Sequence, residues 1–112
     1  MTTAARTGLQ IRSTVKKESV LELSLADVPI PAPKPDEVVV RVEGSPVNPS
    51  DLGLLFGGAD ISTATASGTP DRPIVTAKVG PEMMRAAAAR IDQPMPVGNE
   101  GAGVVVGRGS DS

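Results

Sequence analysis

The chain has 112 residues, a net charge of −2 and 39% hydrophobic residues, which is enough for one small domain at most. Cysteine and histidine are both absent, which excludes disulfides, thiol nucleophiles, the usual zinc sites and serine–histidine triads. Phe56 is the only aromatic residue and no basic patch is present, which argues against nucleic acid as a partner. No apolar run could span a bilayer and no apolar signal segment is present, so we expect a cytoplasmic protein that binds no membrane.

The first part of the chain predicts β-structure. Apolar residues alternate with polar ones over 9–26, with a turn at Glu18–Ser19, which indicates a hairpin with one buried face. Prolines at every second position over 27–35 favour an extended connector without ladder hydrogen bonds. Alternating valines over 38–42 then predict a third strand that ends near Gly44.

A short helix is predicted to begin at Asn48. Asparagine is a common N-cap residue, and Pro49 suits the first helical position, where its missing N–H costs nothing. Asp51 places a carboxylate beside the unpaired amides of the first turn. The pair Gly57–Gly58 ends this helix.

The second part of the chain predicts a loop, a short strand, a helix and a last strand. Small polar residues indicate a loop over 63–69, and a strand is expected over 73–79. The segment 81–91 has a proline and a glutamate in its first turn, followed by four alanines, which predicts a helix. A glycine-rich turn leads into the last strand, over 100–106.

Two motifs together resemble a known family. Asn48-Pro49-Ser50-Asp51 and Gly98-Asn99-Glu100-Gly101-Ala102-Gly103, in this order, are similar to the N-terminal GroES-like catalytic domain of the zinc-free medium-chain dehydrogenase/reductase superfamily. Its quinone oxidoreductase and enoyl reductase branches are the ones resembled. Zinc-using members carry a cysteine where this chain has Asn48 and a histidine where it has Asn99. The resemblance, from about Leu9 to Gly107, implies a mainly β fold with short helices, built as a partly open GroES-like barrel.

The resemblance also implies a function. The chain would be the N-terminal substrate and catalytic domain of an NADPH-dependent, zinc-independent oxidoreductase that reduces a quinone or an enoyl or carbonyl compound. In that role Asn48 and Asp51 are the catalytic candidates, and Asn48 and Asn99 are the candidates for cofactor binding. Asn99 and Glu100 would line the substrate cleft, and no metal site is expected.

The same residues also have simpler structural interpretations. Asn48 and Asp51 suit a helix cap, Asn99 suits a turn with unusual dihedral angles, and Glu100 suits a structural hydrogen bond or salt bridge. Both interpretations of Asn48 can hold together, because an amide has a donor and an acceptor. For the whole chain, the alternative is a non-enzymatic GroES-like oligomeric or partner-binding module.

Two departures from the family pattern shape the expected partners. The segment at about 58–95 is longer than the family's usual connection and is interpreted as an inserted loop and helix. The glycines at 98–103 lack the spacing and the following helix of a dinucleotide fingerprint, so we expect them to serve a tight turn and close backbone approach. We therefore expect residues 1–112 to be a domain fragment, incomplete at its C-terminal side and without a Rossmann domain. Such a fragment would bind NADPH only weakly, would need that domain as a partner, and would form a homodimer through exposed strand edges.

Overall fold

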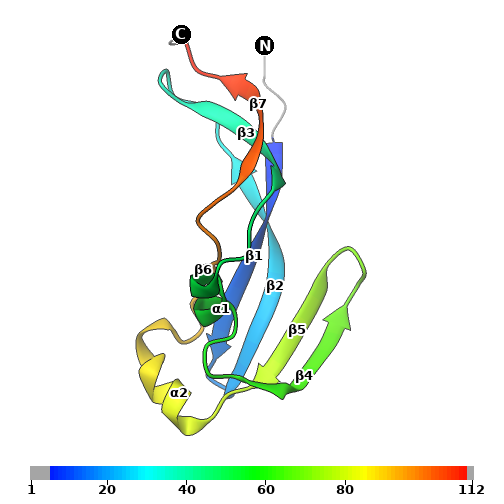
Figure 1. Cartoon of the computed structure of the whole chain (residues 1–112), viewed down its shortest axis with the longest axis vertical. Helices are drawn as coiled ribbons and strands as arrows, with labels where there is room; N and C mark the ends of the chain where they lie inside the picture. Colours follow the sequence, from blue (N-terminus) through cyan, green and yellow to red (C-terminus); the bar gives the residue numbers. More distant parts are fainter. Residues whose placement is uncertain (1–5, 111–112) are drawn as a thin grey trace.

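The computed structural model describes residues 6–110 and is mainly β, with short helices (Figure 1). In chain order the elements are β1 (Arg6–Lys16), β2 (Val20–Ile30), β3 (Val38–Gly44), α1 (Pro49–Leu55), β4 (Asp60–Gly68), β5 (Pro73–Lys78), α2 (Pro81–Ala86), the 3-10 helix η1 (Ala88–Arg90), β6 (Met95–Pro96) and β7 (Ala102–Arg108). An antiparallel sheet has the order β4–β5–β2–β1–β6, and β3 pairs with β7 in a separate ribbon. Within residues 6–110 neither sheet closes into a barrel, so the expected mainly β, partly open fold is confirmed.

The hairpin of β1 and β2 is the longest pairing, and it confirms the hairpin expected over 9–26. Its turn places Ser19 at a φ of 64°, and the Ser19 N–H donates to the Lys16 carbonyl at 3.1 Å. The connector expected over 27–35 is partly wrong, because β2 continues as far as Ile30. Pro29 is compatible with the strand because β5 pairs only with the other end of β2, which leaves this edge open.

The core lies where the turn of the β1–β2 hairpin meets β5 and α2. Val15, Leu21, Val79 and Ala87 are buried there, with Met83, Met84 and Ile91 among the partly buried side chains packed against them. These residues are aliphatic or methionine, as a chain with a single aromatic residue requires. The core is small and occupies one end of the molecule.

The loop expected over 63–69 is wrong for all but its last residue, because 63–68 belong to β4. Its hydroxyls pair across to β5: the Thr65 and Thr76 side-chain oxygens are 3.0 Å apart, and Thr63 Oγ1 accepts the Lys78 N–H at 2.8 Å. Small polar residues therefore form a strand here because the neighbouring strand satisfies them. The strand expected over 73–79 is confirmed as β5.

The helix expected over 81–91 is wrong in length. It ends at Ala86, a 3-10 turn follows, and Ile91 then forms a bridge with Val15 of β1. Arg90 Nη2 donates to the Ser13 carbonyl at 3.1 Å, which also draws this segment onto β1. Contacts with the sheet thus override the helix propensity of the alanines. The pairing of β6 with β1 was not predicted, and the last strand begins at Ala102 rather than at residue 100.

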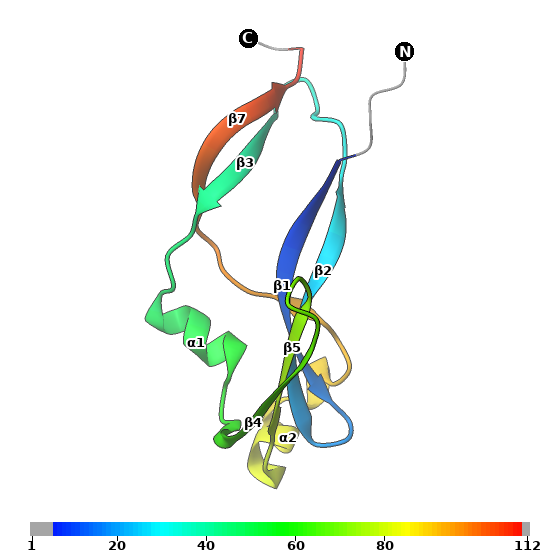
Figure 2. The ribbon, with the colours of Figure 1, turned by 90° about the vertical axis from the view of Figure 1, so that its right-hand side faces the viewer.

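The molecule is elongated, with extents of 51 × 27 × 23 Å. Its radius of gyration is 17.0 Å, whereas a compact domain of this length has about 13 Å. The β3–β7 ribbon extends away from the core, beside the far ends of β1 and β2 (Figure 2). No helix within residues 6–110 is long and apolar enough to cross a membrane.

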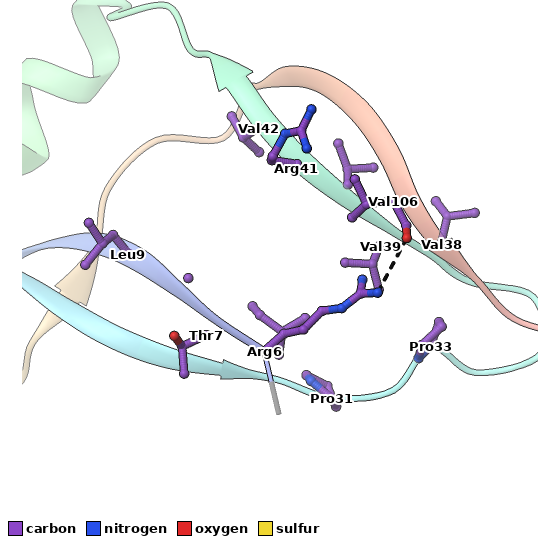
Figure 3. Close-up of a pocket in the computed structure, with 13 residues that line it drawn as sticks. Arg6, Thr7, Leu9, Pro31, Pro33, Val38, Val39, Arg41, Val42 and Val106 are labelled. Carbon is purple, nitrogen blue, oxygen red and sulfur yellow. Dashed lines mark hydrogen bonds between the residues drawn. The ribbon is translucent and has the colours of Figure 1, made fainter. Parts of the chain in front are cut away.

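A groove of about 950 Å³ separates the ribbon from the β1–β2 hairpin (Figure 3). Its walls are mostly apolar, and they include Leu9, Ile30 and the valines of β3. Arg6 reaches across it, and its Nη2 lies 3.5 Å from the Val106 carbonyl (Figure 3).

Candidate functional site

The first motif forms the N-terminus of α1, as predicted. Asn48 is the N-cap, with φ −88° and ψ 156°, and Pro49 opens the helix. The Asn48 N–H donates to Asp51 Oδ2 at 2.8 Å, which is the reciprocal bond of a capping box. Asp51 is buried, with 9% of its surface exposed. Its carboxylate is bonded to the N-terminus of its own helix.

The second motif is a segment with a bend at Asn99 that leads into β7, and the tight turn expected at its glycines is not formed. The positive φ of this segment, 96°, belongs to Gly98 and not to Asn99, so Asn99 is not needed for unusual dihedral angles. Gly103 lies opposite Val42, and a Cβ at this position would overlap the Arg41 carbonyl. The close approach of β7 to β3 therefore requires a glycine, as the sequence predicts.

The two motifs meet through Glu100. Asn48 Nδ2 donates to Glu100 Oε1 at 3.3 Å, across 52 residues of sequence. Ser45 Oγ donates to the Glu100 backbone carbonyl at 2.8 Å. The structural hydrogen bond expected for Glu100 is thus confirmed, and the side-chain amide of Asn48, the N-cap residue of α1, contacts the other motif.

The structure brings Asn48 and Glu100 together on an open surface, with Asp51 buried and bonded to the backbone of Asn48. Asn99 is exposed and lies next to Glu100 in the chain. None of these four residues lines the groove, nor the shallower hollow of about 810 Å³ beside α2. The groove and the site are nevertheless neighbours, because Val42 lines the groove and lies close to Gly101.

The arrangement offers hydrogen bonding rather than metal chemistry. It provides a carboxamide, a carboxylate and a serine hydroxyl at one point on the surface. Across residues 6–110 no three residues of the histidine, cysteine, aspartate and glutamate types come close enough to hold a metal ion. Asn48 and Asn99 each have a side-chain amide with a donor and an acceptor, which can form hydrogen bonds with the carboxamide of a ligand.

Ser45 is the site residue that sequence reasoning missed. It follows the end of β3 and precedes Pro46, which indicates a loop and nothing more. Its partner Glu100 lies 55 residues away, so no local spacing could have revealed the contact.

The fold and site together define a mainly β domain in which two segments far apart in the sequence are joined by side-chain hydrogen bonds. No protein-family model matches the chain, and no curated protein matches it significantly.

Proposed function

We propose that this chain is the substrate-side domain of a cytoplasmic, NADPH-dependent and zinc-independent oxidoreductase that reduces a quinone or an enoyl or carbonyl compound. The observation that supports it most is the Asn48–Glu100 hydrogen bond, because it joins the two motifs that resemble zinc-free medium-chain dehydrogenases/reductases. Asparagine at both positions where zinc-using members carry ligands supports the same proposal.

In this proposal Asn48 is the group that contacts the substrate. Its amide nitrogen carries two protons, of which Glu100 accepts one. The second proton is the donor that we assign to the substrate oxygen, where negative charge develops during reduction. Asp51 is a positioning residue, because it holds the backbone of Asn48 from a buried site.

The described residues fit one end of the cofactor only. When bound, NADPH supplies the hydride. The amides of Asn48 and Asn99 suit its carboxamide, whereas no cavity described above encloses the site. The pyrophosphate and adenosine would therefore be held by a nucleotide-binding domain that acts as the partner of this chain.

A titration of the chain followed by nuclear magnetic resonance tests the proposal. Reduced nicotinamide mononucleotide and p-benzoquinone are added in separate experiments, and backbone shifts are followed. We expect weak, saturable shifts confined to 48–51 and 99–100, which Asn48→Ala removes and the amide deletion Gln93→Ala preserves. Shifts that persist in Asn48→Ala, or no shifts with either probe, would reject the proposed role.

Kinetics of a protein that contains both domains give a second readout. Loss of a cap costs about 1 kcal/mol of stability. Loss of a donor to a developing oxyanion lowers the rate by about 10²–10³. We therefore expect Asn48→Ala to lower kcat/KM far more than it lowers stability, and a loss below about tenfold would leave Asn48 as a cap alone.

A non-enzymatic partner-binding module is the second candidate. The observation that favours it is the exposed apolar surface of the ribbon, where Val42 and Val105 are 60% and 56% exposed. If neither probe binds while the chain still associates with itself or with another protein, this candidate replaces the first.

A further inference from the structure

The groove between the β3–β7 ribbon and the β1–β2 hairpin has the size and the lining of a small-molecule site (Figure 3). Its volume of about 950 Å³ lies in the range of about 300–1,000 Å³ that such sites occupy. Nine of its thirteen lining residues are valine, leucine, isoleucine or proline. Val38, Val40 and Val42 are 56%, 44% and 60% exposed, so a ligand in the groove would remove apolar surface from water.

The charged side chains that line this groove are all cationic. Arg6 and Arg41 are among the lining residues, and no aspartate or glutamate of residues 6–110 is, although the whole chain has a net charge of −2. Arg41 Nη2 already lies 3.3 Å from Glu43 Oε2 of its own strand. Arg6 forms no ion pair with a carboxylate within residues 6–110, so it is the free cation of the groove.

A bulge in the ribbon provides the single protein contact of the Arg6 guanidinium. β7 carries one extra residue, Val106, between Val105 and Gly107, and this residue has no partner on β3. The Val106 carbonyl lies 3.5 Å from Arg6 Nη2, which is long for a hydrogen bond. A guanidinium has five N–H donors, so this contact leaves donors for the oxygens of a ligand.

We propose that the groove binds the anion of a fatty acid. Its carboxylate pairs with Arg6, and its alkyl chain lies along Leu9 and the valines of β3. Pro31 and Pro33 suit an alkyl chain, because they have no N–H that the chain would leave without a partner. An inorganic anion would leave the valines uncovered, and an alkane would leave the arginine unpaired. This inference does not depend on the proposed enzymatic function.

The length and the charge of the ligand give two independent readouts by nuclear magnetic resonance. The chain is titrated with butanoate, hexanoate and octanoate below micelle-forming concentrations, and with octanol, which has the alkyl chain without the charge. Full burial of one CH₂ strengthens binding about fourfold, so we expect about two- to fourfold per CH₂ in this open groove. The shifts should centre on Arg6, Leu9 and β3, and not on 48–51 and 99–100, where the nicotinamide is expected.

Two variants separate the contact with the carboxylate from the contact with the alkyl chain. R6Q should weaken octanoate about fivefold and leave octanol unchanged, because it removes the charge of an exposed arginine. V40T should weaken both ligands about twofold or more, because a hydroxyl replaces a methyl group in the wall. The matched controls R108Q and V105T change β7 outside the groove and should bind both ligands like the wild type.

Several outcomes would overturn the proposal. One is an octanoate that does not bind, or that binds no more tightly than butanoate. Another is an R6Q variant that binds octanoate like the wild type, or that loses octanol as well. A V40T variant with unchanged affinity for both ligands, or a control that loses as much as its matched variant, would also contradict it.

Discussion

The two ends of this molecule differ in how they are held together. At one end the turn of the β1–β2 hairpin, β5 and α2 surround Val15 and Leu21, which are 0% and 2% exposed. At the other end the β3–β7 ribbon exposes its valines, although it contains just as many apolar side chains for its size. Apolar composition alone therefore does not make a core, because burial needs a second layer.

The candidate site lies where the two ends meet. Asn48 begins the helix that leads from the ribbon to the core, and Glu100 begins the return to the ribbon. The end of this helix is tied to the sheet, because Ser13 Oγ donates to the Leu55 carbonyl at 3.2 Å. The site is thus anchored on one side by the packed end and on the other by the exposed ribbon.

The same truncation at both ends should give the largest contrast. We expect Val15→Ala to lower the free energy of unfolding by about 2–3 kcal/mol, because it removes buried methyl groups and leaves a cavity. Val105→Ala, at a residue 56% exposed, should change it by less than about 0.5 kcal/mol. Urea denaturation measures both, and equal losses would show that the ribbon is packed as tightly as the core.

A glycine pair tests how the ribbon itself is held. Gly103→Ala should cost about 1–3 kcal/mol locally, because the added Cβ would overlap the backbone of β3. Gly44→Ala is the control, since open space surrounds its Cβ position. Hydrogen exchange should show faster exchange in β3 and β7 for Gly103→Ala alone. Unchanged exchange in that variant would mean that the strands are not this close.

The cap of α1 should contribute less. We expect Asp51→Ala to cost about 1 kcal/mol, because the Asn48 N–H loses its acceptor. Ser50→Ala, in the same helical turn and exposed, should cost less than about 0.5 kcal/mol. Thermal unfolding of both variants makes the comparison, and similar losses would remove the capping role of Asp51.

The smallest effect is expected at an exposed ion pair of the long sheet. Arg72 Nη2 lies 3.1 Å from Asp27 Oδ1, with side chains 47% and 60% exposed. We expect Asp27→Asn to cost at most about 0.5 kcal/mol, and less at high salt, because solvent and ions screen this pair. A larger loss that does not depend on salt would show that Asp27 has another role.

Local signals explain which parts of the fold could be predicted. The hairpin, the third strand and the start of α1 follow from alternation and from capping residues, which act over a few positions. The loop expected over 63–69 and the full helix expected over 81–91 were wrong because β5 and β1 impose contacts that propensity does not contain. Thr63 begins a run of small polar residues, which indicated a loop, but it lies in a strand because Lys78 of β5 bonds to its side chain.

Apart from Ser45, the residues of the candidate site could be named from the sequence, whereas their contacts could not. The motifs at Asn48 and Glu100 were recognised as sequences, and each also has a local structural role. Their hydrogen bond, and the support from Ser45, depend on how the chain folds between them. The open position of the site is likewise a property of the whole fold.

Hydrogen exchange tests the central claim most directly, that the packed end is the stable part of this molecule and that the exposed ribbon is held more weakly. We predict that amides around Val15 and Leu21 exchange slowest, because these residues lie in the buried core. Amides of β3 should exchange faster, because the ribbon has only two strands within the described residues and its valines are largely exposed. Protection of β3 that equals that of the core would contradict the account.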